Sequence, residues 1–147
     1  MTTIATPVAP SRERLLDRIG IPHSLRWGFL GVLVFMTGNG VESNFIAPHM
    51  AAALGNRAML VPTIITMYGV AVTVASYLSG ALSDLVGPRR VMTLGFAAWV
   101  TFEILFLVSL NAGFTPGIMA SYFLRGLGYP LFAFAFLVWI NTVAPRK

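Results

Sequence analysis

The segment VMTLGFAAWVTFEILFLVSL, residues 91–110, decides the fold because it runs for 20 residues with a single charged side chain, Glu103. A helix needs about 20 apolar residues to cross the hydrocarbon core of a bilayer. Three further segments, at about 27–47, 61–83 and 117–144, are as long and contain at most one charge each. The sequence therefore predicts an all-α membrane protein with four transmembrane helices.

The overall composition supports the same class. Apolar residues make up 56% of the 147 residues and charged residues only 10%, whereas a soluble domain carries about 25% charged residues. There is no cysteine, which excludes disulfides and thiolate metal sites. His23 and His49 lack metal-ligand spacing, and there is no phosphate-binding loop. We therefore expect neither an enzyme nor a bound cofactor.

The distribution of Lys and Arg predicts the orientation of the helices. Eight basic residues precede the first span, lie between the second and third, or follow the fourth, whereas the opposite connections contain only Arg57. The eight are Arg12, Arg14, Arg18, Arg26, Arg89, Arg90, Arg146 and Lys147. This bias places both termini in the cytoplasm. The net charge of +5 is then explained by topology, and no nucleic-acid partner is expected.

The chain divides into two parts. Residues 1–26 form a cytoplasmic leader, in which residues 11–19 either form a short amphipathic helix on the inner membrane surface or remain solvated without fixed structure. Residues 27–147 form the four-helix transmembrane segment. Pro48 and Pro62 are expected to bracket the first external loop.

Three charged residues lie inside the predicted spans: Glu42, Glu103 and Arg125. A charge near the bilayer centre costs ~2.5–3.5 kcal/mol on insertion scales, so such residues usually face a partner or a cavity. Glu42 and Arg125 lie at similar depth in the outer half. They form an ion pair or face a polar substrate, unless Glu42 snorkels outward and Arg125 is a structural lock. Glu103 has no evident partner and is either protonated against lipid or paired with a segment outside this sequence.

Polar residues and glycines cluster around these charges. In Thr37–Asn44, TGNGVESN, two glycines are expected to loosen the helix and expose polar groups at membrane depth. The segment Arg125–Pro130, RGLGYP, is similar. The sequence therefore predicts a substrate and proton cavity, and its residues are Asn39, Glu42, Asn44, Arg125 and Tyr129. Aromatic residues such as Tyr68, Trp99 and Tyr122 also occur within the spans, where packing is their commoner role.

The connection between the second and third spans contains GALSDLVGPRR, residues 80–90. Gly80 permits a close helix approach, and Asp84 places an acid at the cytoplasmic helix end. Gly87 and Pro88 are expected to form the turn, while Arg89 and Arg90 hold it inside. Taken alone, the pattern also fits a tight cytoplasmic loop without a specific role.

This connection resembles the signature between helices two and three of the major facilitator superfamily. The resemblance implies that the chain is the first third of a twelve-helix fold. It also implies a cytoplasmic gate, built from Gly80, Asp84, Gly87, Arg89 and Arg90, that locks against a helix of the second half. Leu85 departs from the family pattern, which often has a basic residue there. Arg125 matches the fourth-helix arginine that the family uses in proton coupling.

A closer resemblance covers most of the chain from Pro22 onward. The segments Val34–Glu42, VFMTGNGVE, and Arg125–Phe132, RGLGYPLF, are similar to the polyol permease branch, which includes ribitol and arabinitol carriers. That branch usually has Asp at the position of Asn39. The resemblance implies proton-driven uptake of a sugar alcohol across a bacterial cytoplasmic membrane, with the proton gradient as energy source. The partners implied are the lipid bilayer, the polyol and the missing carboxyl-terminal helices, so these 147 residues alone are not expected to transport.

Two other interpretations remain open from the residues. The chain could be a complete four-helix proton-coupled exporter that acts as a dimer, or a membrane protein that accompanies a larger transporter without transporting. The strong charge bias opposes the dual topology that an antiparallel dimer requires.

Overall fold

The computed structural model describes residues 25–55, 57 and 59–143. It contains four helices, α2 (Arg26–Ala53), α3 (Leu60–Val86), α4 (Pro88–Asn111) and α5 (Thr115–Val143). Each is long and apolar enough to cross a membrane. The predicted all-α membrane class is confirmed. The proposed leader helix at 11–19 lies outside the described residues.

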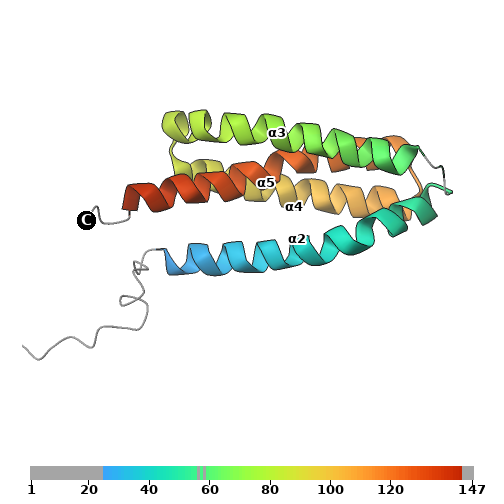
Figure 1. Ribbon diagram of the computed structural model, residues 1–147, viewed down its shortest axis with the longest axis horizontal. Coiled ribbons are helices and arrows are strands. Elements are labelled where there is room, and N and C mark those ends of the chain that lie inside the picture. The colour runs from blue at the N-terminus through green and yellow to red at the C-terminus, as the bar shows by residue number, and fades with distance from the viewer. Residues whose placement is uncertain (1–24, 56, 58, 144–147) are drawn as a thin grey trace, which may run out of the picture.

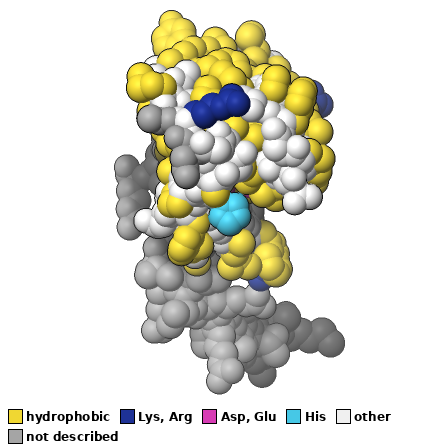
Figure 2. Space-filling view, turned by 90° about the vertical axis from the view of Figure 1, so that its right-hand side faces the viewer, with side chains coloured by type: hydrophobic (Ala, Val, Ile, Leu, Met, Phe, Trp, Pro, Cys, Tyr) yellow, Lys and Arg dark blue, Asp and Glu magenta, His cyan; other side chains and the backbone are white. Residues whose placement is uncertain are grey.

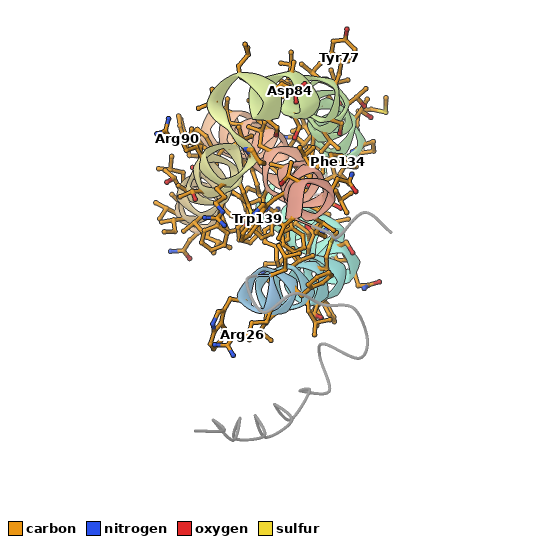
Figure 3. All side chains as sticks on the ribbon, turned by 90° about the vertical axis from the view of Figure 1, so that its left-hand side faces the viewer. Arg26, Tyr77, Asp84, Arg90, Phe134 and Trp139 are labelled. Carbon is orange, nitrogen blue, oxygen red and sulfur yellow. The ribbon has the colours of Figure 1, made fainter. Side chains whose placement is uncertain are left out.

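The four helices run alternately up and down, and α2 lies along one side of the other three (Figure 1). Seen from the end where α2 begins and α5 ends, α3, α4 and α5 form a group from which α2 projects (Figure 3). In α2 only Phe35 and Met50 are buried, whereas α5 has buried residues along most of its length. Helix α5 is therefore the packing centre of the described segment.

Glycines allow α5 to approach its neighbours closely. A Cβ at Gly128 would lie 2.7 Å from the backbone nitrogen of Trp99 on α4, and one at Gly126 would lie 2.9 Å from the carbonyl oxygen of Tyr68 on α3. Gly95 of α4 is equally crowded, since its Cβ would lie 2.6 Å from the backbone nitrogen of Phe132. Small residues at such crossings drive helix association in lipid because they let the backbones touch.

A hydrophobic cluster joins all four helices at the end that carries the α2–α3 and α4–α5 connections. Its buried members are Met50, Leu54, Ile64, Phe106, Ile118 and Tyr122. This cluster anchors the carboxyl-terminal end of α2. Towards its amino-terminal end, α2 is held by aromatic contacts, such as the edge-to-face pair of Phe29 with Phe136 of α5, whose ring centroids are 5.3 Å apart.

Three prolines that the sequence analysis placed in connections lie within helices in the structure. Pro48 and Pro62 do not lie at the ends of the α2–α3 connection as predicted, because α2 continues through Pro48 to Ala53 and Pro62 lies in the first turn of α3. A proline in a first turn replaces a donor that has no helical partner, and one inside a membrane helix is tolerated when its surroundings compensate. Pro88 opens α4, and Gly87, with φ of +92°, makes the turn.

The outer surface is largely apolar. Exposed large side chains include Trp27, Leu33, Phe45, Tyr77 and Leu94, and hydrophobic and uncharged side chains dominate the view onto the end with the α2–α3 connection (Figure 2). A soluble monomer rarely exposes apolar patches of such extent. These surfaces are suited to contact with lipid or with further membrane helices.

Candidate functional site

The charged residues within the spans meet at Arg125. The Arg125 side chain is only 2% exposed and projects from the middle of α5. Its Nη1 donates a hydrogen bond to Oε1 of Glu42 on α2 at 2.5 Å, and its Nη2 donates to Oε2 of the same carboxylate. This two-point pairing of guanidinium and carboxylate is the strongest geometry that such a pair adopts.

A second carboxylate reaches the same guanidinium. Oε2 of Glu103 on α4 lies 2.6 Å from Nε of Arg125. Neither atom has a well-aligned hydrogen-bond partner among the described residues, so the contact is a close ion pair without the directed bonding of Glu42. The prediction that Glu103 lacks a partner within this sequence is wrong. The sequence does not reveal this partner, because position along a helix does not fix the direction in which the Glu103 side chain projects.

Three aromatic rings complete the surroundings of Arg125. The guanidinium carbon lies 5.2 Å from the ring centroid of Trp99, 5.4 Å from that of Tyr122 and 6.0 Å from that of Tyr68. Ring faces attract cations, and the attraction grows when water is excluded. Side chains from all four helices thus converge on Arg125, which we call the Arg125 cluster: Glu42, Tyr68, Trp99, Glu103, Tyr122 and Arg125.

The helices position this cluster through local spacing and close approach. Tyr122 precedes Arg125 by three residues and Trp99 precedes Glu103 by four, so each pair lies on one helix face. Gly126 brings the α5 backbone against Tyr68 of α3. A side chain at position 126 would push α3 away from α5 and move Tyr68 away from the Arg125 guanidinium.

The other predicted cavity residues lie near the cluster without joining it. Tyr129 stacks on Phe35 of α2 with centroids 5.8 Å apart, and its hydroxyl lies 3.7 Å from the sulfur of Met36. The Asn44 amide donates to the carbonyl of Gly40 at 2.8 Å within its own helix, and Asn39 is partly exposed. The expected loosening of the helix at 37–44 is wrong, since α2 is continuous there.

The predicted gate residues lie at the end of the bundle where α3 ends and α4 begins. Asp84 and Arg90 are exposed there, and Figure 3 shows both together with Arg26. The Arg89 guanidinium lies 4.6 Å from the ring centroid of Trp139, so it ties this turn to the last part of α5. No described atom of another helix lies within 4 Å of a Cβ at Gly80, so the described helices do not make the close approach predicted for that glycine.

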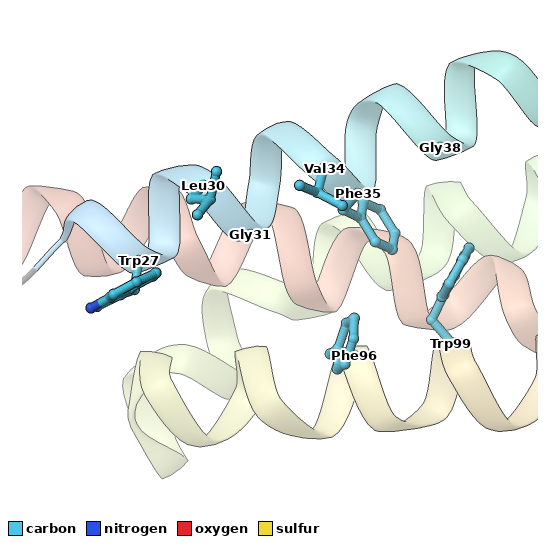
Figure 4. A pocket seen from close by; sticks show the side chains of 8 residues that line it. All are labelled: Trp27, Leu30, Gly31, Val34, Phe35, Gly38, Phe96 and Trp99. Carbon is cyan, nitrogen blue, oxygen red and sulfur yellow. The ribbon is translucent and has the colours of Figure 1, made fainter.

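An apolar cavity of about 540 Å³ lies between α2 and α4. Trp27, Leu30, Val34 and Phe35 line it from α2, and Phe96 and Trp99 line it from α4 (Figure 4). None of the described residues that line it is charged. The cavity lies beside the Arg125 cluster through Trp99, but its lining offers little for recognition of a hydroxylated or charged solute.

Comparison with known proteins identifies the family. The family model of the Major Facilitator Superfamily matches residues 14–147. This chain belongs to the major facilitator superfamily. The residues matched include the turn at Gly87 and Arg125 of α5, the two features whose sequence resembles signatures of this family. No solved structure matches this superfamily chain significantly.

Curated relatives of this superfamily member carry different names. The chain is 39% identical to an alpha-ketoglutarate permease of Bacillus subtilis over 132 residues, which are 89% of the chain and 30% of the relative. It is 38% identical to a ribitol transporter of Klebsiella pneumoniae over 122 residues, 82% of the chain and 28% of the relative. A D-arabinitol transporter of the same organism is 37% identical over 123 residues, 83% of the chain and 29% of the relative. The chain thus spans about three tenths of the length of these relatives.

Proposed function

We propose that this chain is part of a secondary active transporter that takes up a sugar alcohol, or a similar small polar metabolite, together with protons. It acts as a transporter segment rather than an enzyme and needs no cofactor beyond the proton gradient. The small four-helix exporter is disfavoured by the family match over residues 14–147.

The observation that carries this proposal is the Arg125 cluster. Two carboxylates and one guanidinium are held together inside four apolar helices, with Arg125 only 2% exposed and the Glu42 and Glu103 side chains 22% and 18% exposed. Ionisable residues at membrane depth usually mark ion or substrate pathways because their burial is costly. A carboxylate in such a site is able to bind a proton and to accept hydrogen bonds from hydroxyl groups.

The charge of the cluster favours a neutral solute. Arg125 is already engaged by Glu42 and Glu103, so no free cation remains among the described residues of the cluster to bind an anionic solute. A polyol offers hydroxyl donors to the carboxylate oxygens of such a site, whereas the carboxylates of alpha-ketoglutarate would find no available guanidinium there. Sequence identity does not separate the candidates, since the relatives named for alpha-ketoglutarate and for ribitol are 39% and 38% identical. Uptake of alpha-ketoglutarate is therefore the second candidate.

The proposed setting follows from the charges in the connections. The transporter lies in a bacterial cytoplasmic membrane with both termini of this chain inside, so the turn with Asp84, Arg89 and Arg90 faces the cytoplasm. There it forms part of a gate with helices that follow this segment. The cavity residues Asn39, Asn44 and Tyr129 stand beside the Arg125 cluster along the proposed solute path.

Transport by the native protein tests the proposal. The protein is extracted from its own membrane, its intact mass is measured, and it is reconstituted in liposomes with an inward proton gradient. Labelled ribitol and D-arabinitol should accumulate, a protonophore should abolish the accumulation, and alpha-ketoglutarate should not enter.

Two variants sharpen this experiment. Arg125→Gln should abolish polyol accumulation, whereas Arg57→Gln, which removes the same charge from an exposed connection, should retain it. Uptake of alpha-ketoglutarate instead would establish the second candidate. A native mass near 15.9 kDa without any uptake would favour a non-transporting membrane protein.

A further inference from the structure

The Arg125 cluster contains one more carboxylate than its arginine can neutralise. Glu42 occupies Nη1 and Nη2 of Arg125, and Glu103 is left with Nε, which it approaches at 2.6 Å without good alignment. A net negative charge buried among apolar helices is costly, and a buried group usually avoids that cost by taking a proton. The structure therefore raises the question of which carboxylate is protonated.

The hydrogen-bond geometry distinguishes the two carboxylates. Both Glu42 oxygens accept directed bonds from the guanidinium, and such bidentate, charge-assisted bonds favour the ionised form. Oε2 of Glu103 is buried and lacks a directed bond. Protonation of Glu42 would break the better pair, whereas protonation of Glu103 would sacrifice only the poorer contact.

The other described groups around Glu103 supply no second cation. The titratable or charged side chains that face the cluster are Tyr68 from α3, Tyr122 and Tyr129 from α5, and Glu42 from α2, besides Arg125 itself. Trp99, on the same helix as Glu103, does not titrate. Among the described residues, then, a proton is the available means of removing the excess charge.

We propose that Glu103 is a proton-binding site of this protein, and that loss of its proton makes Glu103 compete with Glu42 for Arg125. The proposal rests on the proposed function for its role in transport, though the proton site itself does not depend on the substrate. When Glu103 is neutral, Arg125 is held by Glu42 alone. When Glu103 ionises, the guanidinium is shared between α2 and α4.

Helix α2 is the element that this competition would affect most. Most of its residues are exposed, and the Arg125–Glu42 pair is the ionic link that the structure shows between α2 and α5. Weakening that link leaves α2 attached by the Met50–Leu54 region at one end and by aromatic contacts towards the other. Proton release from Glu103 would thus loosen the middle of α2, beside the cavity between α2 and α4.

Infrared difference spectroscopy on the native protein tests the proton site without any substrate. The carbonyl stretch of a protonated carboxyl group should disappear as the pH is raised. Glu103→Asp keeps the carboxyl group but changes its surroundings, so it should shift this band, whereas Glu42→Asp should leave the band in place. Asp84→Asn removes an exposed acid near the end of α3 and serves as the control that leaves the band unaltered.

The opposite results would overturn the proposal. A band that shifts with Glu42→Asp and not with Glu103→Asp would assign the proton to Glu42. If none of the bands that disappear at high pH is altered by Glu103→Asp, Glu103 carries no exchangeable proton. Each variant is first checked for the elution volume of the folded protein, and a Glu103→Asp protein that fails this check is replaced by Glu103→Gln, in which the band should be lost.

A transport measurement then links the site to coupling. Glu103→Gln should lose proton-driven accumulation, so that internal and external solute concentrations become equal, while exchange of internal for external solute continues. A Glu103→Gln protein that still accumulates solute against its gradient would refute the coupling role. Because the infrared result needs no solute, failure to find polyol uptake would refute the proposed substrate and leave the proton site standing.

Discussion

Replacement of Gly128 by alanine tests the packing that positions the Arg125 cluster. The new Cβ would lie 2.7 Å from the backbone nitrogen of Trp99 and 2.8 Å from both the Trp99 Cα and the Gly95 carbonyl oxygen. The shortest of these contacts is 0.7 Å below the 3.4 Å at which ordinary van der Waals contact begins. Because all three atoms belong to the α4 backbone, no side chain can move aside, and α4 and α5 must separate by about that amount.

The expected cost follows from two opposing effects. Overpacking of a tight site costs ~1–3 kcal/mol, and the rigid backbone neighbours place Gly128→Ala at the upper end of that range. Alanine recovers up to ~1 kcal/mol because it is a better helix former than glycine. The net loss in the free energy of unfolding should therefore be ~2 kcal/mol.

Gly69→Ala is the matched control. Gly69 lies within α3, and no described atom of another helix lies within 4 Å of a Cβ at that position. The same substitution there should be neutral or stabilising, by up to ~1 kcal/mol. The two variants should thus shift stability in opposite directions, although both add one methyl group to a membrane helix.

Unfolding by titration with sodium dodecyl sulfate in detergent micelles, followed by far-ultraviolet circular dichroism, measures both free energies. Gly128→Ala should unfold at a lower denaturant fraction than the unmodified protein, and Gly69→Ala at an equal or higher one. Equal stability of the two variants would refute the close α4–α5 approach and the positioning of Glu103 and Trp99 that depends on it.

Three further predictions concern the ionic contacts and the orientation. Reversing the charge of either Glu42 or Arg125 should lower the free energy of unfolding by ~3–5 kcal/mol, because it leaves buried charges uncompensated. The combined exchange Glu42→Arg with Arg125→Glu should recover folded protein that each single change loses. Lack of recovery would argue against the pair seen in the structure. Arg89→Ala removes the cation–π contact with Trp139 and should lower the free energy of unfolding by ~0.5–1 kcal/mol, the value of an exposed contact of this kind. Unchanged Trp139 fluorescence would contradict that contact. A cysteine that replaces Asp84 should react with a membrane-impermeant reagent in inverted vesicles, which expose the cytoplasmic face, and not in right-side-out vesicles. A cysteine that replaces Arg57 should react only in right-side-out vesicles. The reverse pattern would overturn the orientation.

The sequence was sufficient to predict the helices because the property that defines them is local. A run such as residues 91–110 must form its backbone hydrogen bonds internally if it enters a bilayer, so length and apolarity predict a helix whatever lies beside it. The positions of glycine and proline are a poorer guide to where the helices end. Pro48 was assigned to a loop because proline interrupts helices in general, yet one missing backbone bond did not end α2.

The contacts of the candidate site were only partly predictable. Similar depth from the membrane surface suggested that Glu42 and Arg125 meet, because rise per residue is fixed in a helix. Depth alone carries no information about the angle at which a side chain projects, so it does not predict a partner for Glu103. Its ion pair with Arg125 depends on the rotation of α4 about its axis and on the approach of α5.

By itself, then, the sequence determined that this is a four-helix membrane segment and which of its charges lie within the spans, and it predicts which connections face the cytoplasm. These properties follow from the transfer of side chains and backbone between water and lipid, which acts on each segment separately. Only the tertiary structure decided that two carboxylates and three aromatic rings share one arginine. That convergence arises from backbone contacts at Gly95, Gly126 and Gly128, which set the spacing and rotation of helices that are distant in sequence.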